Sequence, residues 1–485
     1  MYWMIASVAL AIISGPLMLA TKPLRNRTPR IAVAVALQAI ITVCGWATVL
    51  GGDCATGRYR FTDALSVGFA ADGLARFFCG LIVTAWLLVT VYAGVYMKHE
   101  KSEERFFLFS FLTEGAMLGA AFSDSLVSMY VFYEMVTLFS MPLVLHSLSQ
   151  ESVAAAKKYL YYSVAGAFMA LFGIFVISTQ TDTLLFVPGG SVAEATPLLL
   201  VAVFVLCLGF GAKAGLFPLH GWLPTAHPVA PAPASALLSG IIAKAGVLAI
   251  VRTVYFAVGP DRLAGTWVQT ALLCLSLLTV LMGSMMAYRE KIFKKRLAYS
   301  TVSQISYVLT GLFLFSEAGV EGAMWQILFH AAVKVGLFLC AGAVIFLYGK
   351  TRVEELDGIG KKMPITFACF TVLSLSLIGI PPTGGFFSKW YLATAALESS
   401  DIGALSWLAP AILLLSALLT AGYLLQITIK AFFKKEADAD TATVKEPAAM
   451  TLVLAVLALV ALVDGLLAAQ TGGLLTTVVS SCFAR

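Results

Sequence analysis

Apolar segments long enough to cross a membrane recur along almost the whole chain. A bilayer-spanning helix needs about 20 mostly apolar residues. Apolar residues make up 60% of the 485-residue sequence and charged residues only 12%, about half of the charged fraction of an average soluble domain. Such a chain lacks the polar surface that a soluble enzyme, a nucleic-acid-binding protein or a disordered scaffold needs. It is therefore predicted to be a multi-pass membrane protein.

We expect an all-α bundle of about fourteen spans. Lipid cannot hydrogen-bond to open strand edges, and the sequence has no series of alternating ten-residue segments typical of a membrane barrel. The expected spans cover residues 4–20, 31–50, 73–97, 105–122, 125–146, 155–178, 197–217, 231–256, 264–287, 297–316, 321–348, 364–394, 405–432 and 449–470.

Basic residues are concentrated in alternate loops. The segments 22–30, 98–105, 157–158, 289–296, 350–362 and 430–445 together contain 22 of the 32 lysines and arginines. The opposite loops and the C-terminus contain six, namely Arg58, Arg60, Arg76, Arg252, Arg262 and Arg485. Because cytoplasmic loops carry the excess of basic residues, we expect a cell-membrane protein with both termini on the outer side. An even number of spans agrees with that orientation.

No cofactor, metal or nucleotide site is expected in this chain. Its eight cysteines are scattered and form no CxxC pair, so they predict neither an iron–sulfur cluster nor a zinc site. The sequence contains no GxGxxG or Walker motif. Any redox or ATP chemistry is therefore expected on another chain.

The remaining four lysines, Lys213, Lys244, Lys334 and Lys389, lie inside expected spans. A charged residue at mid-membrane costs about 2.5–3.5 kcal/mol on insertion scales. Desolvation also weakens the hold of a lysine on its proton, so these residues are candidates for proton transfer. A static ion pair or a side chain reaching to the interface explains one such lysine equally well, but four in separate spans less so.

Two acidic residues also lie near the middle of expected spans. Glu134 is a candidate partner for a buried lysine, since a mid-membrane carboxylate needs a cation nearby to stay ionised. Glu114 lies in the span 105–122. A protonated or hydrogen-bonded packing residue is at least as good an interpretation of Glu114 as a functional one.

Proline and glycine interrupt two of the expected spans. Prolines at 218, 224, 228, 231 and 233 cannot all lie in one continuous helix, and transporter helices are interrupted in this way at their binding sites. His220 and His227 flank this break, as candidate proton relays or as structural caps. A second break is expected in Gly-Ile-Pro-Pro-Thr-Gly-Gly at 379–385, just before Lys389.

The two breaks suggest an internal repeat, although direct sequence similarity between the halves is weak. We divide the chain into N-terminal helices (1–104), a first repeat (105–256), a second repeat (264–432) and a C-terminal helix (449–485). In the second repeat, His330 and Lys334 are four residues apart, which places them on one face of a helix.

Several motifs resemble those of the antiporter-like subunits shared by respiratory complex I, multi-subunit cation/proton (Mrp) antiporters and membrane-bound energy-converting hydrogenases. The similarity covers roughly residues 100–400. The motifs are SDSLVSMYVFYE at 123–134, AAAKKYLYYS at 154–163, KAGLFPLHGWLPTAHPVAPAPASALLSGIIAKAG at 213–246, FHAAVKVGLFL at 329–339 and GIPPTGGFFSKW at 379–390.

The resemblance implies fourteen helices with two inverted five-helix repeats, in which helices seven and twelve are broken. It implies that Glu134 is the carboxylate of helix five and Lys213 its ion-pair partner on helix seven. Lys244 corresponds to the central lysine of helix eight, His330 and Lys334 to the hydrated axis, and Lys389 to the terminal lysine of helix twelve. Some complex I members have glutamate there, so lysine favours an Mrp D-type, hydrogenase or other complex I subunit. No role transfers to Glu114.

The resulting hypothesis is a proton-translocating subunit of an Mrp-type Na⁺/H⁺ antiporter. Opening of the Glu134–Lys213 pair would release a proton toward Lys244 and onward to Lys389. Two alternatives stay open: a proton-pumping subunit of a redox-driven complex, and a non-conducting structural subunit. The expected partners are other membrane subunits, with redox subunits carrying Fe–S clusters in the redox-driven case, and no nucleic acid. Since lysines repel Na⁺, which needs oxygen ligands, any Na⁺ path is expected in a partner subunit.

Overall fold

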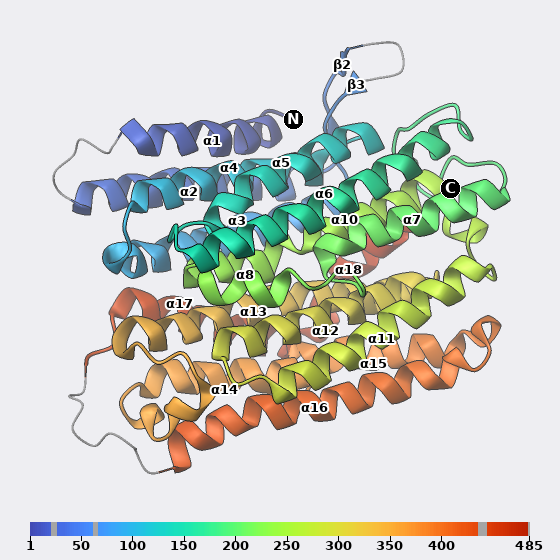
Figure 1. The fold of residues 1–485 in the computed structure, drawn as a ribbon. Coiled ribbons are helices and arrows are strands. Elements are labelled where there is room, and N and C mark those ends of the chain that lie inside the picture. Colours follow the sequence, from blue (N-terminus) through green and yellow to red (C-terminus); the bar gives the residue numbers. More distant parts are fainter. Residues whose placement is uncertain (21–26, 62–65, 435–443, 484–485) are drawn as a thin grey trace.

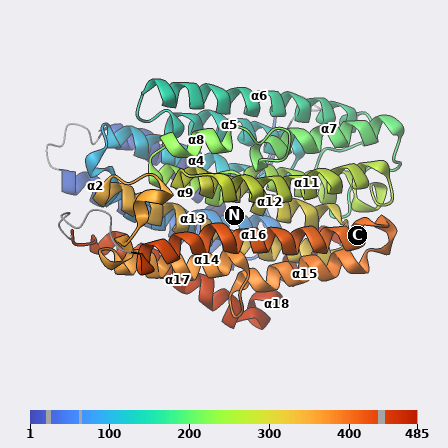
Figure 2. The ribbon, with the colours of Figure 1, turned by 60° about the horizontal axis from the view of Figure 1, so that its bottom comes forward.

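The structure is a computed structural model that describes residues 1–20, 27–61, 66–434 and 444–483. It is a bundle of helices that run side by side along one direction (Figures 1 and 2). Lys22, Arg25, Lys435 and Arg485, four of the cations used to predict the orientation, lie outside the described residues. The α-helices are α1 (Tyr2–Ala20), α2 (Arg27–Leu50), α3 (Gly73–Tyr96), α4 (Glu103–Phe122), α5 (Leu126–Val144), α6 (Gln150–Ser178), α7 (Pro197–Ala214), α8 (Leu223–Val229), α9 (Ala232–Leu237), α10 (Lys244–Val251), α11 (Trp267–Arg289), α12 (Phe293–Phe313), α13 (Glu317–Tyr348), α14 (Pro364–Ile378), α15 (Gly384–Glu398), α16 (Leu405–Phe433), α17 (Ala448–Leu466) and α18 (Ala468–Phe483).

The all-α membrane architecture is confirmed. Within the described residues, twelve helical segments are long and apolar enough to cross a membrane. The expected spans at 297–316 and 364–394 correspond to α12 and to α14 with α15, which are not among those twelve. Polar side chains interrupt the apolar surface of α12, and a break divides α14 from α15. The count of about fourteen spans therefore stays a prediction.

Both predicted helix breaks are present. The helix α7 ends at Gly215, whose φ of 84° lies in the left-handed region, and α14 ends in the same way at Gly379 with a φ of 93°. Glycine adopts this conformation without the steric cost of a side chain. After the first break the chain forms α8 and then a second apolar segment, in which the π-helical turns η2 (Leu238–Ile242) and η3 (Arg252–Val258) flank α10.

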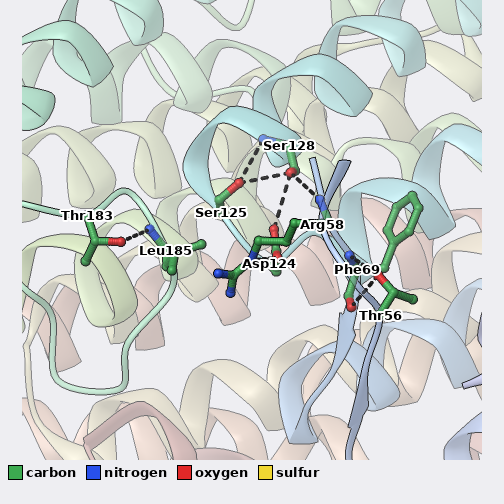
Figure 3. Close-up of polar contacts among 9 residues, drawn as sticks. Thr56, Arg58, Phe69, Asp124, Ser125, Ser128, Thr183 and Leu185 are labelled. Atoms are coloured by element: carbon green, nitrogen blue, oxygen red, sulfur yellow. Dashed lines mark hydrogen bonds and ion pairs between the residues drawn. The ribbon is translucent and has the colours of Figure 1, made fainter. Parts of the chain in front are cut away.

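Short strands between α2 and α3 fix the start of α5. The strand β1 (Cys54–Ala55) pairs with β4 (Ala70–Ala71), and β2 (Tyr59–Arg60) pairs with β3 (Ser66–Val67). Arg58 donates to Asp124 at 2.7 Å, and the Gly68 amide donates to Ser128 Oγ at 3.2 Å (Figure 3). Ser125 caps α5 by accepting from the Ser128 amide. These contacts hold α5, the helix that carries Glu134, in position.

A loop after α6 contacts the same end of α5. The Leu126 amide donates to the Leu184 carbonyl, and the Phe186 amide donates to the Asp124 carbonyl. Within the loop, the Leu185 amide donates to Thr183 Oγ1 at 3.1 Å (Figure 3). The beginning of α5 is therefore held from two sides by segments distant in sequence.

Candidate functional site

The lysines predicted from the sequence lie inside the bundle. Lys213, Lys244 and Lys334 are at most 2% exposed, and His330 is fully buried. Lys389 and Glu134 are half-buried. These six residues, called the lysine row below, come from α5, α7, α10, α13 and α15. Both halves of the chain therefore contribute to the lysine row.

The first part of the site joins α5 and α7. Lys213 Nζ donates to Thr137 Oγ1 at 2.6 Å and to the Tyr133 carbonyl at 3.0 Å, and it lies 3.9 Å from the centre of the Tyr133 ring. Among the described residues, Lys213 forms no ion pair with Glu134, and Glu134 Oε1 has no hydrogen-bond partner. The predicted Glu134–Lys213 pair is thus open in this structure, with the amine held by neutral acceptors.

A direct contact joins the two central residues. Lys244 Nζ lies 2.8 Å from His330 Nδ1 and also donates to the Ser239 carbonyl at 3.1 Å. The π-helical turn η2 comes just before Lys244, and such turns are frequent at functional sites. A neutral histidine ring has one donor and one acceptor nitrogen. The geometry therefore allows a proton to pass from Lys244 to Nδ1 of His330 without an intervening group.

Lys334 lies one helical turn beyond His330 and faces α12. Its Nζ donates to the Leu297 carbonyl at 3.1 Å and to Ser300 Oγ at 2.5 Å. The next residue of α12, Thr301, shares a 2.7 Å hydrogen bond with Ser239. Lys334 thus contacts Ser300 of α12. Ser239, whose carbonyl accepts from Lys244, contacts the adjacent Thr301 of the same polar helix.

Amide and hydroxyl groups extend this polar region toward Lys389. Gln326 donates to Gln304 Oε1 at 2.9 Å and accepts from Ser388 Oγ at 2.6 Å. Lys389 Nζ donates to the Leu377 carbonyl at 2.8 Å, in the last turn before the second break. These amide and hydroxyl groups are not among the residues predicted from the sequence. For Gln304, the signal that could have found it is the run of Ser, Thr and Gln at 300, 301, 303, 304, 306 and 310 in a span that is otherwise largely apolar.

The two histidines near the first break have different surroundings. His220 is half-buried and stacks on Phe217, with ring centroids 5.9 Å apart. His227 is fully buried and stacks on Phe338 at 4.6 Å. In the described part of the chain, neither ring nitrogen of His227 has a hydrogen-bond partner. Neither histidine contacts the row of lysines directly.

Lys294 occupies a different place from the one expected. Its position in the sequence predicts a loop cation, but it lies in the first turn of α12, is 5% exposed and donates to the Ala230 carbonyl at 2.5 Å. Lys294 and Glu100 line a cleft of about 180 Å³. His227 is within electrostatic reach of both Lys294 and Lys334.

Glu114 lies apart from this row. It is fully buried between α2 and α4, where Gln38 Nε2 donates to its Oε1 at 2.7 Å. This contact fits a hydrogen-bonded packing residue.

No group of three or more His, Cys, Asp or Glu residues with the geometry of a metal site occurs within the described residues.

Comparisons with known proteins place the chain in a family. The profile described as "NADH:quinone oxidoreductase/Mrp antiporter, TM" matches residues 123–420, and that described as "NADH-Ubiquinone oxidoreductase (complex I), chain 5 N-terminus" matches residues 62–107. The chain belongs to the NADH:quinone oxidoreductase/Mrp antiporter family. It is an antiporter-like, proton-translocating membrane subunit, as the sequence motifs predict.

Relatives from both branches of this family are similar to the chain. It is 34% identical over 374 residues to NADH-quinone oxidoreductase subunit N of Desulforudis audaxviator, covering 75% of this chain and 72% of the relative. It is 31% identical over 341 residues to the D-type subunit of the Na⁺/H⁺ antiporter of Alkalihalophilus pseudofirmus, covering 70% of this chain and 67% of the relative.

Solved structures share the fold over the whole length. A chain of the Mrp complex from Dietzia sp. matches with a TM-score of 0.87 and 23% identity, over 100% of this chain and 98% of that chain. A chain of respiratory complex I from Thermus thermophilus matches with a TM-score of 0.80 and 24% identity, over 99% and 100%. Both structures are of multi-subunit membrane complexes, and the fold that they share with this chain is that of a multi-pass membrane protein.

Proposed function

We propose that the chain is the proton-translocating subunit of an Mrp-type cation/proton antiporter and that Glu134, Lys213, Lys244, His330, Lys334 and Lys389 carry the proton. The observation that carries this proposal is the 2.8 Å contact between Lys244 and His330, within a row of buried amines. Four amines inside a bilayer are costly to insert. Their common position along one polar region supports a shared function rather than four independent packing roles.

The proton moves along the row by changes of pairing. When Lys213 contacts Glu134, the opposite charge favours the protonated amine. When it contacts Thr137 without a direct ion pair, as in this structure, that support is weaker and the proton can leave toward Lys244. His330 then accepts at Nδ1. Since a general acid or base must lie within about 2.6–3.2 Å of its proton partner, or one water away, the gaps on either side of this contact require water.

The polar residues of α12, α13 and α15 supply sites for that water. A buried water needs two to four polar partners, and Ser300, Gln304, Gln326 and Ser388 provide hydroxyl and amide groups between Lys334 and Lys389. These neutral groups orient water, whereas the lysines carry the charge of the transferred proton. Lys389 is the last amine of the row, next to the second helix break.

Protons reach the row from the face that carries the basic loops. The cleft lined by Glu100 and Lys294 lies among the residues that join these loops, and both Lys294 and Lys334 act electrostatically on His227. With the basic loops in the cytoplasm, both termini lie on the outer side. His227 and His220 are relays at the first break. Na⁺ needs oxygen ligands, so its path belongs to a partner subunit.

A redox-driven complex is the second candidate function. It is favoured by the 34% identity to a subunit named NADH-quinone oxidoreductase subunit N. In that case the same row pumps protons, and partner subunits with Fe–S clusters supply the energy. A non-conducting structural role is the third candidate, in which the lysines would tolerate exchange for methionine or glutamine.

Two measurements test these alternatives. The first is gentle purification of the tagged chain from its native membrane, followed by mass spectrometry. Small hydrophobic subunits without redox proteins support the antiporter, and flavin, iron–sulfur or nickel–iron subunits identify a redox-driven pump. The second is transport by the intact complex in proteoliposomes. Lys213→Ala and Glu134→Ala are expected to abolish proton movement in a complex of unchanged composition, and normal transport by both variants would rule out the proposed path.

A further inference from the structure

A large apolar cavity lies on a flank of the bundle, away from the lysine row. It has a volume of about 540 Å³ and is formed by α2, α3, α13, α17 and α18. Its α13 wall consists of Leu328, Ala331, Ala332 and Val335, whereas His330 and Lys334 are not part of it. Figure 2 shows α17 and α18 along the lower edge of the molecule, opposite α6.

One acidic side chain faces this cavity. Asp464 lines it near the end of α17, and its Oδ2 atom is buried without a hydrogen-bond partner among the described residues. Asp464 packs against the second helix break, because a Cβ atom placed on Gly384 would lie 3.3 Å from the Asp464 Cβ. A carboxyl group within a membrane span is costly unless a partner satisfies it. The proposed proton path does not use this residue.

Arg76 is the other charged residue of the lining, as far as the chain is described. It marks the rim, because it forms a 2.6 Å ion pair with Asp53, whose side chain is 68% exposed. The remaining walls are aliphatic and aromatic, with a few threonines. The cavity thus combines an apolar surface with a single acid that has an unpaired, buried oxygen atom.

We propose that a transmembrane helix of a neighbouring subunit packs over this cavity and fills it with its side chains, one of which is a lysine or arginine placed against Asp464. A lipid tail would fill the apolar walls equally well, but it has no donor and would leave Asp464 Oδ2 unsatisfied. Intramembrane charged residues almost always face a protein partner or water and pair with one another. The multi-subunit complexes among the structural neighbours provide such partners. This inference does not depend on the proton path.

Photo-crosslinking in the intact complex tests the proposal. A benzophenone side chain replaces Leu474, which lines the cavity and is 73% exposed, or Leu414 of α16, which is 69% exposed and lies outside the lining. We expect Leu474, but not Leu414, to crosslink to a transmembrane peptide that contains a lysine or arginine. Asp464→Leu should reduce this crosslink about tenfold, and Asp464→Glu should preserve it.

Several outcomes would overturn the proposal. They are lipid adducts alone at position 474, a crosslinked peptide without a basic residue, or an equal crosslink yield in Asp464→Leu and wild type. If Asp464→Leu fails to accumulate, changing the basic residue of the captured peptide to methionine gives the same test from the partner side. Proton transport measured in the same membranes shows separately whether the lysine row functions.

Discussion

The contact between Lys244 and His330 is the point at which one side chain can interrupt the proposed path. Asparagine at position 330 retains an acceptor for the Lys244 amine but cannot titrate, so we expect His330→Asn to fold and assemble. Because proton transfer by a positioned side chain contributes about 10²–10⁴-fold, proton movement in proteoliposomes should fall at least about 100-fold.

Glu114 provides the matched control for His330→Asn. Both residues are fully buried and ionisable, but Glu114 is hydrogen-bonded to Gln38 outside the row. Glu114→Gln should therefore keep near-normal transport. Wild-type rates in His330→Asn, or a complete loss in Glu114→Gln, would show that the path runs elsewhere.

At the residue scale, the sequence predicted the charged groups but not their partners. A lysine inside an apolar span is conspicuous because of its insertion cost. Thr137 and Ser300, which hold Lys213 and Lys334, are inconspicuous, since a hydroxyl group in a membrane helix usually bonds to its own backbone. Only the packing of α5 on α7 and of α12 on α13 reveals which hydroxyl groups face an amine.

The helix breaks act at the scale of the element, because they end α7 and α14 next to the lysines. Gly215 has a positive φ, and a Cβ atom there would lie 2.5 Å from Leu223 Cδ1. Gly215→Ala is expected to lower the free energy of unfolding by about 1–3 kcal/mol from backbone strain alone, with the collision in addition. Thermal denaturation of the purified complex measures the effect.

Gly349→Ala separates these two contributions. Gly349 also ends a helix at positive φ, but a Cβ atom there has nothing within 4 Å. This variant should show the strain alone, and its transport should stay near normal. If the two variants lose equal stability, the close contact of Gly215 with α8 has no energetic role.

At the scale of the element, the positions of proline and glycine in the sequence predicted both breaks correctly, since these residues act on the backbone directly. The hydropathy pattern predicted that the start of α12 lies in a loop, where Lys294 and Arg296 would be solvated cations. In the structure these side chains are 5% and 4% exposed and donate to the carbonyls of Ala230, Glu290 and Tyr423. Because Ala230 and Tyr423 come from other segments of the chain, no local pattern could predict that burial.

For the molecule as a whole, the ion pair between Asp72 and Arg252 joins segments 180 residues apart. Burial raises the pKa of the Asp72 carboxyl group, but the charge and hydrogen bonds of Arg252 outweigh this effect and lower the pKa below its ordinary value. The stabilisation is therefore complete above the ordinary carboxyl pKa of about 4 and decreases as the pH falls through the lowered value.

Asp72→Asn keeps the helix cap but leaves Arg252, which is 1% exposed, without its partner. We expect the free energy of unfolding to fall by about 3–5 kcal/mol at neutral pH. It should also depend less on pH across the acid range. Asp53→Asn removes the exposed ion pair with Arg76 and should lower the free energy of unfolding by less than about 1 kcal/mol. Unfolding midpoints of the purified protein, measured across the acid range, would refute this role if Asp72→Asn matched wild type at pH 7.

The distribution of charge over the whole molecule predicts on which side of the membrane the proposed path begins. The structure brings three of the basic loops together: Ile292 bridges to Arg352, Lys291 pairs with Glu354 at 2.9 Å, and Lys430 pairs with Asp357 at 3.2 Å. The pKa of Glu354 is lowered by its hydrogen bond from Lys291, so this carboxylate stays ionised at neutral pH.

Such a cluster should stay in the cytoplasm, with the N-terminus outside. A membrane-impermeant maleimide should therefore label a cysteine at Tyr2, which is 80% exposed, from outside intact cells. A cysteine at Lys291, on the opposite face, should be labelled only after the membrane is opened. The reverse pattern would leave the lysine row intact but make the cleft at Lys294 an outlet for protons, because the cleft and the basic loops share one face.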